Sequence, residues 1–598
     1  MLALALPLAM AYSAHGQAAA EYRPHAMQPE QWPKQAVRAP HGMVATDEQL
    51  GSQACVEILK RGGNAVDAAV GVAFALAVVE PAAGNIGGGG FMLVRLADGR
   101  TQFLDYREVA PGKAARNMYI GADGKLIPNE NVTSSVLGYR SVAVPGTVAG
   151  LELALKTYGT LRLAEVMAPA IRLAKEGFPV SEHLARELNE EKSGLQQFPV
   201  SKRIFLNDGK MLHAGDTLRQ PELAATLQRI AKNGAAEFYR GETARLVVDD
   251  ITRNGGIITL DDLAQYQPKV REVLHAEYKI NDRVGSAHSW EVLTSPPPSS
   301  GGVAIIEALN MLKNVPLKGW DDVESVHMVA ETMRRVFADR AAYLADPDFS
   351  NVPVAGLTDP CYAKELEDTI DPQHASSSKT VKAGTPHTCA RTSSTAAPTT
   401  VSFNDGPHTT HFSVVDAAGN AVASTYTLND SYGSHVTSPA GFLLNDEMDD
   451  FTTQPGVPNA LFGLIQSNAN AIAPGHRPLS SMSPTILLRD GKLSFVTGSP
   501  GGPTIISATL LSVINWMRLG MDAQAAINAP RFHHQWLPDL ILMEQNFPEA
   551  MEKELQARGF TTKRRGHIGL VNAIGVDPKT SDRLGAADPR DGGSAVGY

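Results

Sequence analysis

A segment with few large side chains divides this chain and constrains how it can fold. Between residues 375 and 400 the composition shifts to Ser, Thr, Ala and Pro, which cannot pack a core, so we predict a flexible linker over 375–408. Two β-prone runs, 409–416 and 421–428, follow at once around a Gly-Asn turn and predict a hairpin. Thr409 is therefore expected at the start of a strand, directly after the predicted linker.

Apolar spacing and turn residues predict further helices and strands on both sides of the predicted linker. Helices are expected at 47–60, 64–79 and 504–519, a strand at 91–96, a hairpin from 485–488 and 493–496, and a mainly helical scaffold from 151 to 333. The glycine run 87–90 lies between a helix and a strand, and no Lys-Ser/Thr pair follows it. Phosphate-binding loops have the opposite order, so the run indicates a tight turn or a close approach of backbones.

Composition excludes several classes of partner. Of the 598 residues 43% are hydrophobic and 19% charged, which is typical of a large globular protein. The formal net charge of −10 gives no cationic footprint for nucleic acid or for an anionic membrane. The longest apolar stretch, 65–79, carries Asp67 and is shorter than the ~20 residues that cross a bilayer, so it predicts a buried helix rather than a membrane span.

The first twenty residues resemble a secretory signal peptide. An apolar run at 2–10 leads to three small residues at 18–20, and this pattern predicts export, to the periplasm or out of the cell. The alternative is a frayed apolar terminus, because no Lys or Arg precedes Arg23.

The cysteines and histidines indicate no metal site or other cofactor. The 3 cysteines cannot all pair and no Cys-x-x-Cys is present; Cys55 is expected to be a buried thiol, while pairing of Cys361 with Cys389 after export stays open. No ligand set with metal spacing accompanies His533 and His534, so we expect a structural role for them.

Thr409 is the candidate nucleophile. If the bond between His408 and Thr409 is cut, Thr409 gains an α-amine with a pKa of about 8, which can act as base for the hydroxyl of the same residue. The branched Cβ also restricts χ1 and helps to hold the hydroxyl in one direction. The alternative is an ordinary strand threonine.

Short motifs spread over nearly the whole chain favour the catalytic interpretation of Thr409 over an ordinary strand threonine. They are RGGNAVDAA at 61–69, GNIGGGG at 84–90, DYRE at 105–108, TTH at 409–411, NDEMDDF at 445–451, RPLSSMSPT at 477–485 and GSPGG at 498–502. Together they resemble the γ-glutamyltransferase family (γ-glutamyl transpeptidase, glutathione hydrolase) of N-terminal-nucleophile hydrolases.

The resemblance implies a fold and a maturation route. The fold would be α/β (α+β), a four-layer αββα sandwich of two stacked sheets flanked by helices. The precursor would cut itself into a large chain, 21–408, and a small catalytic chain, 409–598, which stay together. Thr409 would be the nucleophile, and Thr427 would orient it.

The resemblance also implies a pocket for a γ-glutamyl group, which carries a carboxylate and an ammonium at one end. The residues expected to contact the carboxylate are Arg107, Ser480 and Ser481, and those for the ammonium are Asn429, Glu447 and Asp450. Backbone N–H groups of Gly501 and Gly502 would stabilise the oxyanion. Taken singly, Arg107 beside Glu108 reads as a surface ion pair, 446–450 as a solvated turn and the glycines as a strand-to-helix turn.

The implied activity is cleavage of the γ-glutamyl amide of glutathione and related compounds, with transfer of the acyl group to water or to an amino acid or dipeptide. Residues 455–468 resemble the family's lid loop, with Phe462 where many members have tyrosine. Relatives that prefer β-lactam side chains shorten this loop, so its presence favours γ-glutamyl substrates. The alternatives are an acylase of the same architecture acting on glutaryl amides, and a secreted binding protein without catalysis. The balance of hydrolysis and transfer, and the preferred acceptor, stay open.

Overall fold

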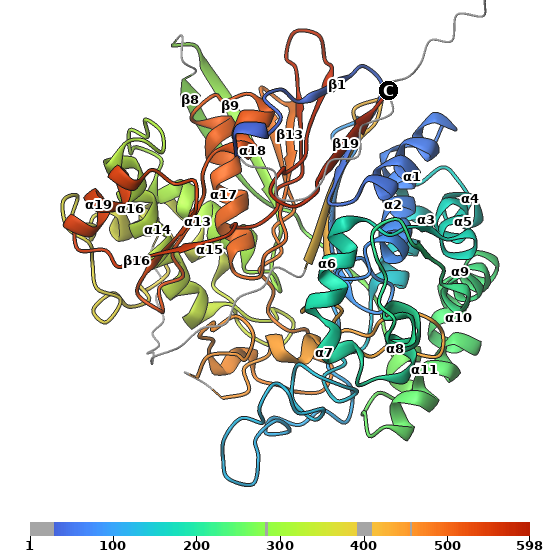
Figure 1. Ribbon diagram of the computed structural model, residues 1–598. Coiled ribbons are helices and arrows are strands. Elements are labelled where there is room, and N and C mark those ends of the chain that lie inside the picture. The colour runs from blue at the N-terminus through green and yellow to red at the C-terminus, as the bar shows by residue number, and fades with distance from the viewer. Residues whose placement is uncertain (1–28, 282–284, 391–408, 455–456) are drawn as a thin grey trace, which may run out of the picture.

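The computed structural model describes residues 29–281, 285–390, 409–454 and 457–598 (Figure 1). The predicted signal segment and the 391–408 part of the predicted linker lie outside these residues. Two large sheets stand face to face in the middle of the molecule, with helices on the outer side of each (Figure 1). The predicted αββα arrangement is confirmed.

Within the described residues each large sheet has 7 strands, all paired antiparallel to their neighbours. The first runs in the order β19 (Ser594–Gly597), β2 (Met43–Thr46), β10 (Thr409–Val415), β11 (Ala421–Thr427), β3 (Gly89–Arg95), β4 (Thr101–Asp105) and β7 (Lys269–Arg271). The second runs in the order β1 (Val37–Ala39), β18 (Arg583–Ala586), β17 (Ala573–Val576), β13 (Lys492–Thr497), β12 (Thr485–Arg489), β9 (Ala287–Thr294) and β8 (Leu274–Asn281).

Apolar layers hold the sandwich together. Between the sheets lie side chains such as Phe91, Phe103, Val415, Ile486 and Val496, all of them buried. Helices α1 (Gln49–Lys60) and α2 (Ala65–Val79) cover the first sheet, and α13 (Gly301–Met311), α14 (Val323–Tyr343) and α17 (Thr504–Met517) lie on the side of the second. Every residue of α2 is buried, as its apolar sequence predicts.

The other helices fill the two outer layers. They are α3 (Thr147–Tyr158), α4 (Leu163–Val166), α5 (Ala168–Glu176), α6 (Glu182–Glu190), α7 (Lys192–Leu195), α8 (Pro199–Phe205), α9 (Pro221–Asn233), α10 (Ala235–Arg240), α11 (Glu242–Arg253), α12 (Leu260–Gln265), α15 (Val354–Leu357), α16 (Pro360–Glu367), α18 (Ala523–Asn528) and α19 (Glu549–Ala557). Two small sheets contain β5 (Phe178–Pro179), β6 (Thr217–Leu218), β14 (Phe532–His533), β15 (Ile541–Glu544) and β16 (Thr562–Arg565). Among the described residues, no helix is both long and apolar enough to cross a membrane.

Local sequence rules account for most of these elements. Asn64 caps α2, and Asp67 completes the capping box by accepting from the Asn64 N–H at 2.8 Å. The glycine run is a close approach of backbones, because a Cβ on Gly88 would lie 2.0 Å from the Thr427 carbonyl oxygen. The helical prediction for 151–333 was incomplete, since it missed the β8–β9 hairpin at the edge of the second sheet. The solvent-facing side chains of β8 are polar, so its sequence lacks the continuous apolar signal of a central strand.

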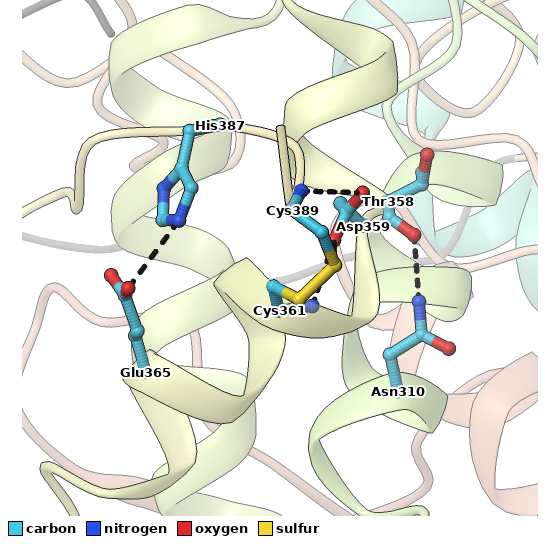
Figure 2. The surroundings of a disulfide bond; sticks show 7 residues. All are labelled: Asn310, Thr358, Asp359, Cys361, Glu365, His387 and Cys389. Carbon is cyan, nitrogen blue, oxygen red and sulfur yellow. Dashed lines mark hydrogen bonds and ion pairs between the residues drawn. A yellow bond between two sulfur atoms is a disulfide. The ribbon is translucent and has the colours of Figure 1, made fainter. Parts of the chain in front are cut away.

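A disulfide joins Cys361, on α16, to Cys389 in the coil that follows (Figure 2). The described part of the Ser/Thr/Pro-rich segment, 375–390, is held in place rather than free. The Ser378 N–H donates to Asp539 at 2.7 Å, and the Gly384 N–H donates to Asp339 at 2.8 Å. The serine and threonine side chains of this segment make few apolar contacts, but its backbone N–H groups donate to buried or partly buried carboxylates. Cys55 is a buried free thiol, as expected.

Candidate active site

Thr409 opens the central strand β10 at an end where the sheet is incomplete. On one side, Thr409 pairs in register with Thr427 of β11. On the other side, within the described residues, β2 pairs only with 413–415. Asp47, just beyond β2, accepts instead from the Thr410 hydroxyl at 2.9 Å. The start of β10 thus has backbone pairing on one side only, from β11, and is held on the other side by the side chain of Asp47.

The two predicted catalytic threonines contact one another. The Thr409 hydroxyl donates to the Thr427 hydroxyl oxygen at 3.1 Å, and the Asn429 N–H donates to that same oxygen at 2.8 Å. Asn429 has φ of +85°, a left-handed conformation that turns the chain away directly after β11. The Thr427 hydroxyl therefore holds the Thr409 hydroxyl in one direction.

His411 lies on β10 two residues after Thr409, and burial lowers its pKa to about 3. Its ring nitrogens lie 2.7 Å from the Thr425 hydroxyl and 3.1 Å from the Ser413 hydroxyl. A neutral imidazole that is engaged at both ring nitrogens is a poor candidate for a general base.

Arg107 lies at the centre of a buried ion cluster. Its two terminal nitrogens lie 2.5 Å from a carboxylate oxygen of Glu447 and 2.5 Å from one of Asp450, and Glu108 is 3.5 Å away. Its Nε donates to the Pro478 carbonyl at 3.2 Å. The predicted carboxylate-binding arginine and the predicted ammonium-binding carboxylates thus form ion pairs with one another here. Neither a surface ion pair nor a solvated turn describes them.

Burial dominates the electrostatics of this cluster. It raises the pKa of Glu108 to about 7, against the pull of the Arg107 charge. It also raises the pKa of Glu447 well above its usual range, and the charges of Glu108 and Asp450 add to this effect. The same carboxylates outweigh the burial of Arg107 and raise its pKa. Burial and the repulsion between these carboxylates therefore favour the neutral forms of Glu108 and Glu447 more than is usual for glutamates.

Ser480 and Ser481 lie in the coil before β12 and are both buried. The Ser480 carbonyl accepts from the Ser300 N–H at 2.7 Å and from the Ser300 hydroxyl at 2.6 Å. The Ser480 N–H donates to the Pro298 carbonyl at 2.9 Å. The start of α13 thus fixes the backbone that carries the two serines.

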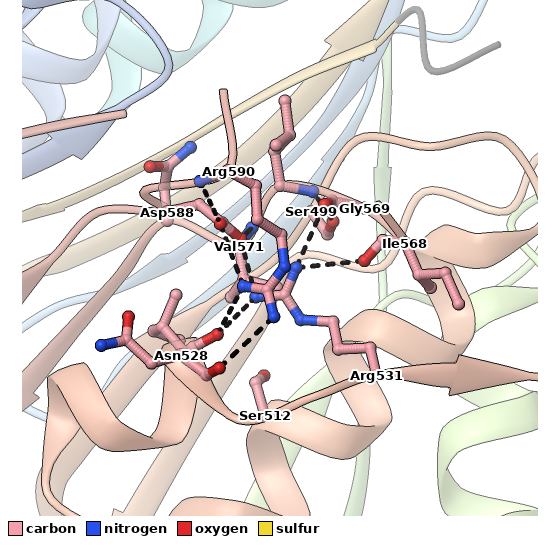
Figure 3. Close-up of polar contacts among 12 residues, drawn as sticks. Ser499, Ser512, Asn528, Arg531, Ile568, Gly569, Val571, Asp588 and Arg590 are labelled. Atoms are coloured by element: carbon pink, nitrogen blue, oxygen red, sulfur yellow. Dashed lines mark hydrogen bonds and ion pairs between the residues drawn. The ribbon is translucent and has the colours of Figure 1, made fainter. Parts of the chain in front are cut away.

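The turn after β13 carries Gly501 and Gly502, whose φ values of +129° and +54° suit glycine. A buried ionic network supports this turn (Figure 3). Arg531 donates to the carbonyls of Ile568 and Gly569 at 3.0 and 3.1 Å, while Ser499 accepts from the Leu570 N–H at 2.9 Å. The loop at 568–570 is thus held by Arg531 and is bonded in turn to Ser499, at the start of the glycine turn.

One pocket gathers nearly all of the predicted residues. Its walls include Arg107, Thr409, Thr427, Asn429, Glu447, Asp450, Ser480, Ser481 and Gly502, together with Phe462 and Leu464 of the predicted lid. Gly501 is next to this pocket but is not among the wall residues. A Cβ on Gly502 would lie 2.6 Å from the Phe462 ring, so lid and glycine turn touch. The free volume is only about 20 Å³.

Sequence reasoning missed one charged residue beside this pocket. Arg340 of α14 is buried, and one of its terminal nitrogens donates to the Ser481 hydroxyl at 3.3 Å. Arginines in a helix are usually solvated, so nothing in the sequence singled it out. The structural role expected for His533 is consistent with its neighbours: burial lowers its pKa to about 3, and its ring lies 2.5 Å from the Ser507 hydroxyl.

Two stacked antiparallel sheets between helical layers, with a threonine at the first position of a central strand, are the arrangement of the N-terminal-nucleophile hydrolases. Residues 51–598 match the sequence profile of the family described as Gamma-glutamyltranspeptidase. The chain belongs to this family.

Relatives and solved structures agree with this assignment. The chain is 44% identical to the glutathione hydrolase proenzyme of Escherichia coli (strain K12), over 93% of this chain and 91% of that protein. It is 36% identical to the acylase ACY 1 proenzyme of Pseudomonas sp. (strain SE83), over 91% of each. The crystal structure of cephalosporin acylase from Bacillus halodurans is similar, with a TM-score of 0.80, 28% identity and coverage of 96% of this chain and 98% of that one. A chain of Helicobacter pylori gamma-glutamyltranspeptidase has a TM-score of 0.53 and 42% identity, and covers 56% of this chain and 94% of its own.

Proposed function

We propose that this enzyme cleaves the γ-glutamyl amide bond of glutathione and related compounds through an ester on Thr409, and passes the acyl group to water or to an amino acid or dipeptide. One observation carries the proposal. The Thr409 hydroxyl lies in the wall of the same pocket as a buried arginine with carboxylates of opposite charge. The relatives named glutathione hydrolase proenzyme support the choice of substrate.

The donor subsite follows from the charges in this pocket. The α-carboxylate of the substrate would replace part of the internal pairing of Arg107 and accept from the hydroxyls of Ser480 and Ser481. The α-ammonium would bind the carboxylates of Glu447 and Asp450. Asn429 adds a side-chain oxygen, because its amide nitrogen already donates to the Asp446 carbonyl at 3.2 Å. A ligand with both charges exchanges one set of ion pairs for another, so few charges are left unpaired.

The chemistry then proceeds at the other end of the pocket. The α-amine of Thr409 takes the proton from Oγ1, which attacks the γ-carbonyl carbon, while Thr427 fixes the direction of attack. The N–H groups of Gly501 and Gly502 stabilise the oxyanion. The C–N bond breaks as the leaving amine takes the proton from the Thr409 ammonium. Water or an acceptor amine then attacks the ester and frees Thr409.

This mechanism needs a cut chain, and relatives named proenzymes support one. We place the cut before Thr409, giving a large chain 21–408 and a small chain 409–598 that stay together. They have no separate cores: β10 and β11 of the small chain lie between β2 and β3 of the large chain. Removal of residues 1–20 on export would complete maturation and give a periplasmic or secreted enzyme.

Paired substrates test the proposal against the acylase alternative. A γ-glutamyl anilide carries both charges, whereas a glutaryl anilide lacks only the ammonium. We expect kcat/KM for the γ-glutamyl compound to be higher by about 100-fold or more, because the buried carboxylates would lose their cation with glutaryl. Equal rates, or a preference for glutaryl, would assign the protein to the acylases. A chain that remains whole after purification and releases nothing from the γ-glutamyl compound would favour a binding protein.

A further inference from the structure

Arg340 lies outside the wall of the pocket and contacts Ser481, one of the wall residues. It lies near the C-terminal end of α14 with 2% of its surface exposed. Its Nε donates to the Ser300 hydroxyl at 3.0 Å, and its Nη2 donates to the Ser481 hydroxyl at 3.3 Å. Its Nη1 is buried and has no hydrogen-bond partner among the described residues. The guanidinium is thus only partly satisfied.

Arg340 is linked to both serines of the pocket, Ser480 and Ser481. Ser481 is held directly by its hydroxyl. Ser480 is held through Ser300, whose hydroxyl accepts from Arg340 and donates to the Ser480 carbonyl at 2.6 Å. Arg340 therefore orients the Ser481 hydroxyl and, through Ser300, helps to hold the backbone of Ser480.

The charge of Arg340 is also uncompensated. Elsewhere on α14, Arg334 and Arg335 both pair with Glu331, at 3.1 and 2.7 Å. No carboxylate oxygen of the described residues lies within ion-pairing distance of Arg340, and Asp450 acts on it only from further away. Burial accordingly lowers the pKa of Arg340 to about 10. A buried cation of this kind is stabilised when an anion binds nearby.

The geometry points to Arg340 as a positioning and specificity residue: it orients the Ser481 hydroxyl, holds the backbone of Ser480 through Ser300, and supplies positive charge that the α-carboxylate of the donor offsets. This inference rests on the proposed function, and it adds a determinant for one substrate group. Arg340 acts through the serines and through space, since it is not among the residues that line the pocket.

The test removes one charge from the protein and the matching charge from the substrate. Arg340→Gln and Arg340→Lys are compared with wild type on a γ-glutamyl anilide and on a 4-aminobutyryl anilide, which lacks only the α-carboxylate. We expect Arg340→Gln to raise KM for the γ-glutamyl compound about tenfold or more, with kcat changed less than about threefold. The 4-aminobutyryl compound should lose less than about threefold in kcat/KM. Arg340→Lys, which keeps the charge, should fall between wild type and Arg340→Gln.

The matched control is Arg335→Gln, a buried arginine of the same helix whose partners are Glu331 and Thr369. Its effect should be the same for both substrates. Equal losses on both substrates in Arg340→Gln, a loss confined to kcat, or an Arg340→Lys as poor as Arg340→Gln would overturn the inference. If Arg340→Gln does not fold, as judged by melting, the substrate-dependent KM shift must appear in Arg340→Lys. Wild type inactive on both compounds would instead refute the proposed function.

Discussion

Replacing Arg107 by lysine tests the donor subsite most informatively. The planar guanidinium places separate nitrogens 2.5 Å from Glu447 and 2.5 Å from Asp450, and a third donates to the Pro478 carbonyl at 3.2 Å. A lysine ammonium presents all of its protons from one nitrogen and cannot span these partners. At least one charge-assisted hydrogen bond is lost, which is worth about 1.5–3 kcal/mol, so KM should rise about 10- to 100-fold.

The assay measures kcat and KM separately for a γ-glutamyl anilide. We expect kcat to change less than about threefold, because Arg107 does not contact the reacting carbonyl in the proposed complex. Arg271→Lys is the control: Arg271 pairs with Asp105 at 2.6 Å and Asp348 at 2.8 Å, away from the pocket walls. Its KM should equal that of wild type. An unchanged KM in Arg107→Lys would remove Arg107 from the carboxylate-binding role.

Three further predictions concern the remaining parts of the pocket. Thr427→Val should lower kcat about tenfold, because the acceptor that orients the nucleophile is lost, whereas Thr427→Ser should stay near wild type; a wild-type kcat in Thr427→Val would contradict the role. Gly502→Ala should lower kcat about 100-fold, since its Cβ would lie 2.6 Å from Phe462, whereas Gly491→Ala, with a similar φ and open space around it, should leave kcat unchanged; equal effects would point to strain alone. Because burial raises the pKa of Glu447 well above its usual range, that carboxyl gains its charge at a higher pH than an ordinary glutamate does, so KM should fall as the pH rises, and Glu447→Gln should flatten this slope; an unchanged slope would exclude Glu447 as its source.

The strands and helices with strong local signals were predicted well from the sequence. The hairpin around Thr409, for example, is in place at 409–415 and 421–427, because its β-prone runs are divided by a Gly-Asn turn. Residues in the motifs also meet in one pocket, although they come from distant parts of the chain. The hairpin β8–β9 was missed because an edge strand needs little apolar sequence.

Interactions between distant residues were beyond sequence reasoning. Nothing local indicates that Arg107 pairs with Glu447 and Asp450, since these meet only when η3 (Glu447–Asp450) folds against the end of β4. Arg340 was hidden for the same reason, because its burial depends on how α14 packs. The anchoring of 375–390 likewise depends on acceptors elsewhere, such as Asp539 and Asp339.

The account depends on a free amino group at Thr409, and N-terminal sequencing with intact mass measurement tests this directly. The purified wild-type protein should give two chains, the smaller one beginning at Thr409. Thr409→Ala should give one uncut, inactive chain. A protein that hydrolyses γ-glutamyl anilide while its 408–409 bond is intact, or a Thr409→Ala variant recovered as the same two chains, would contradict the account.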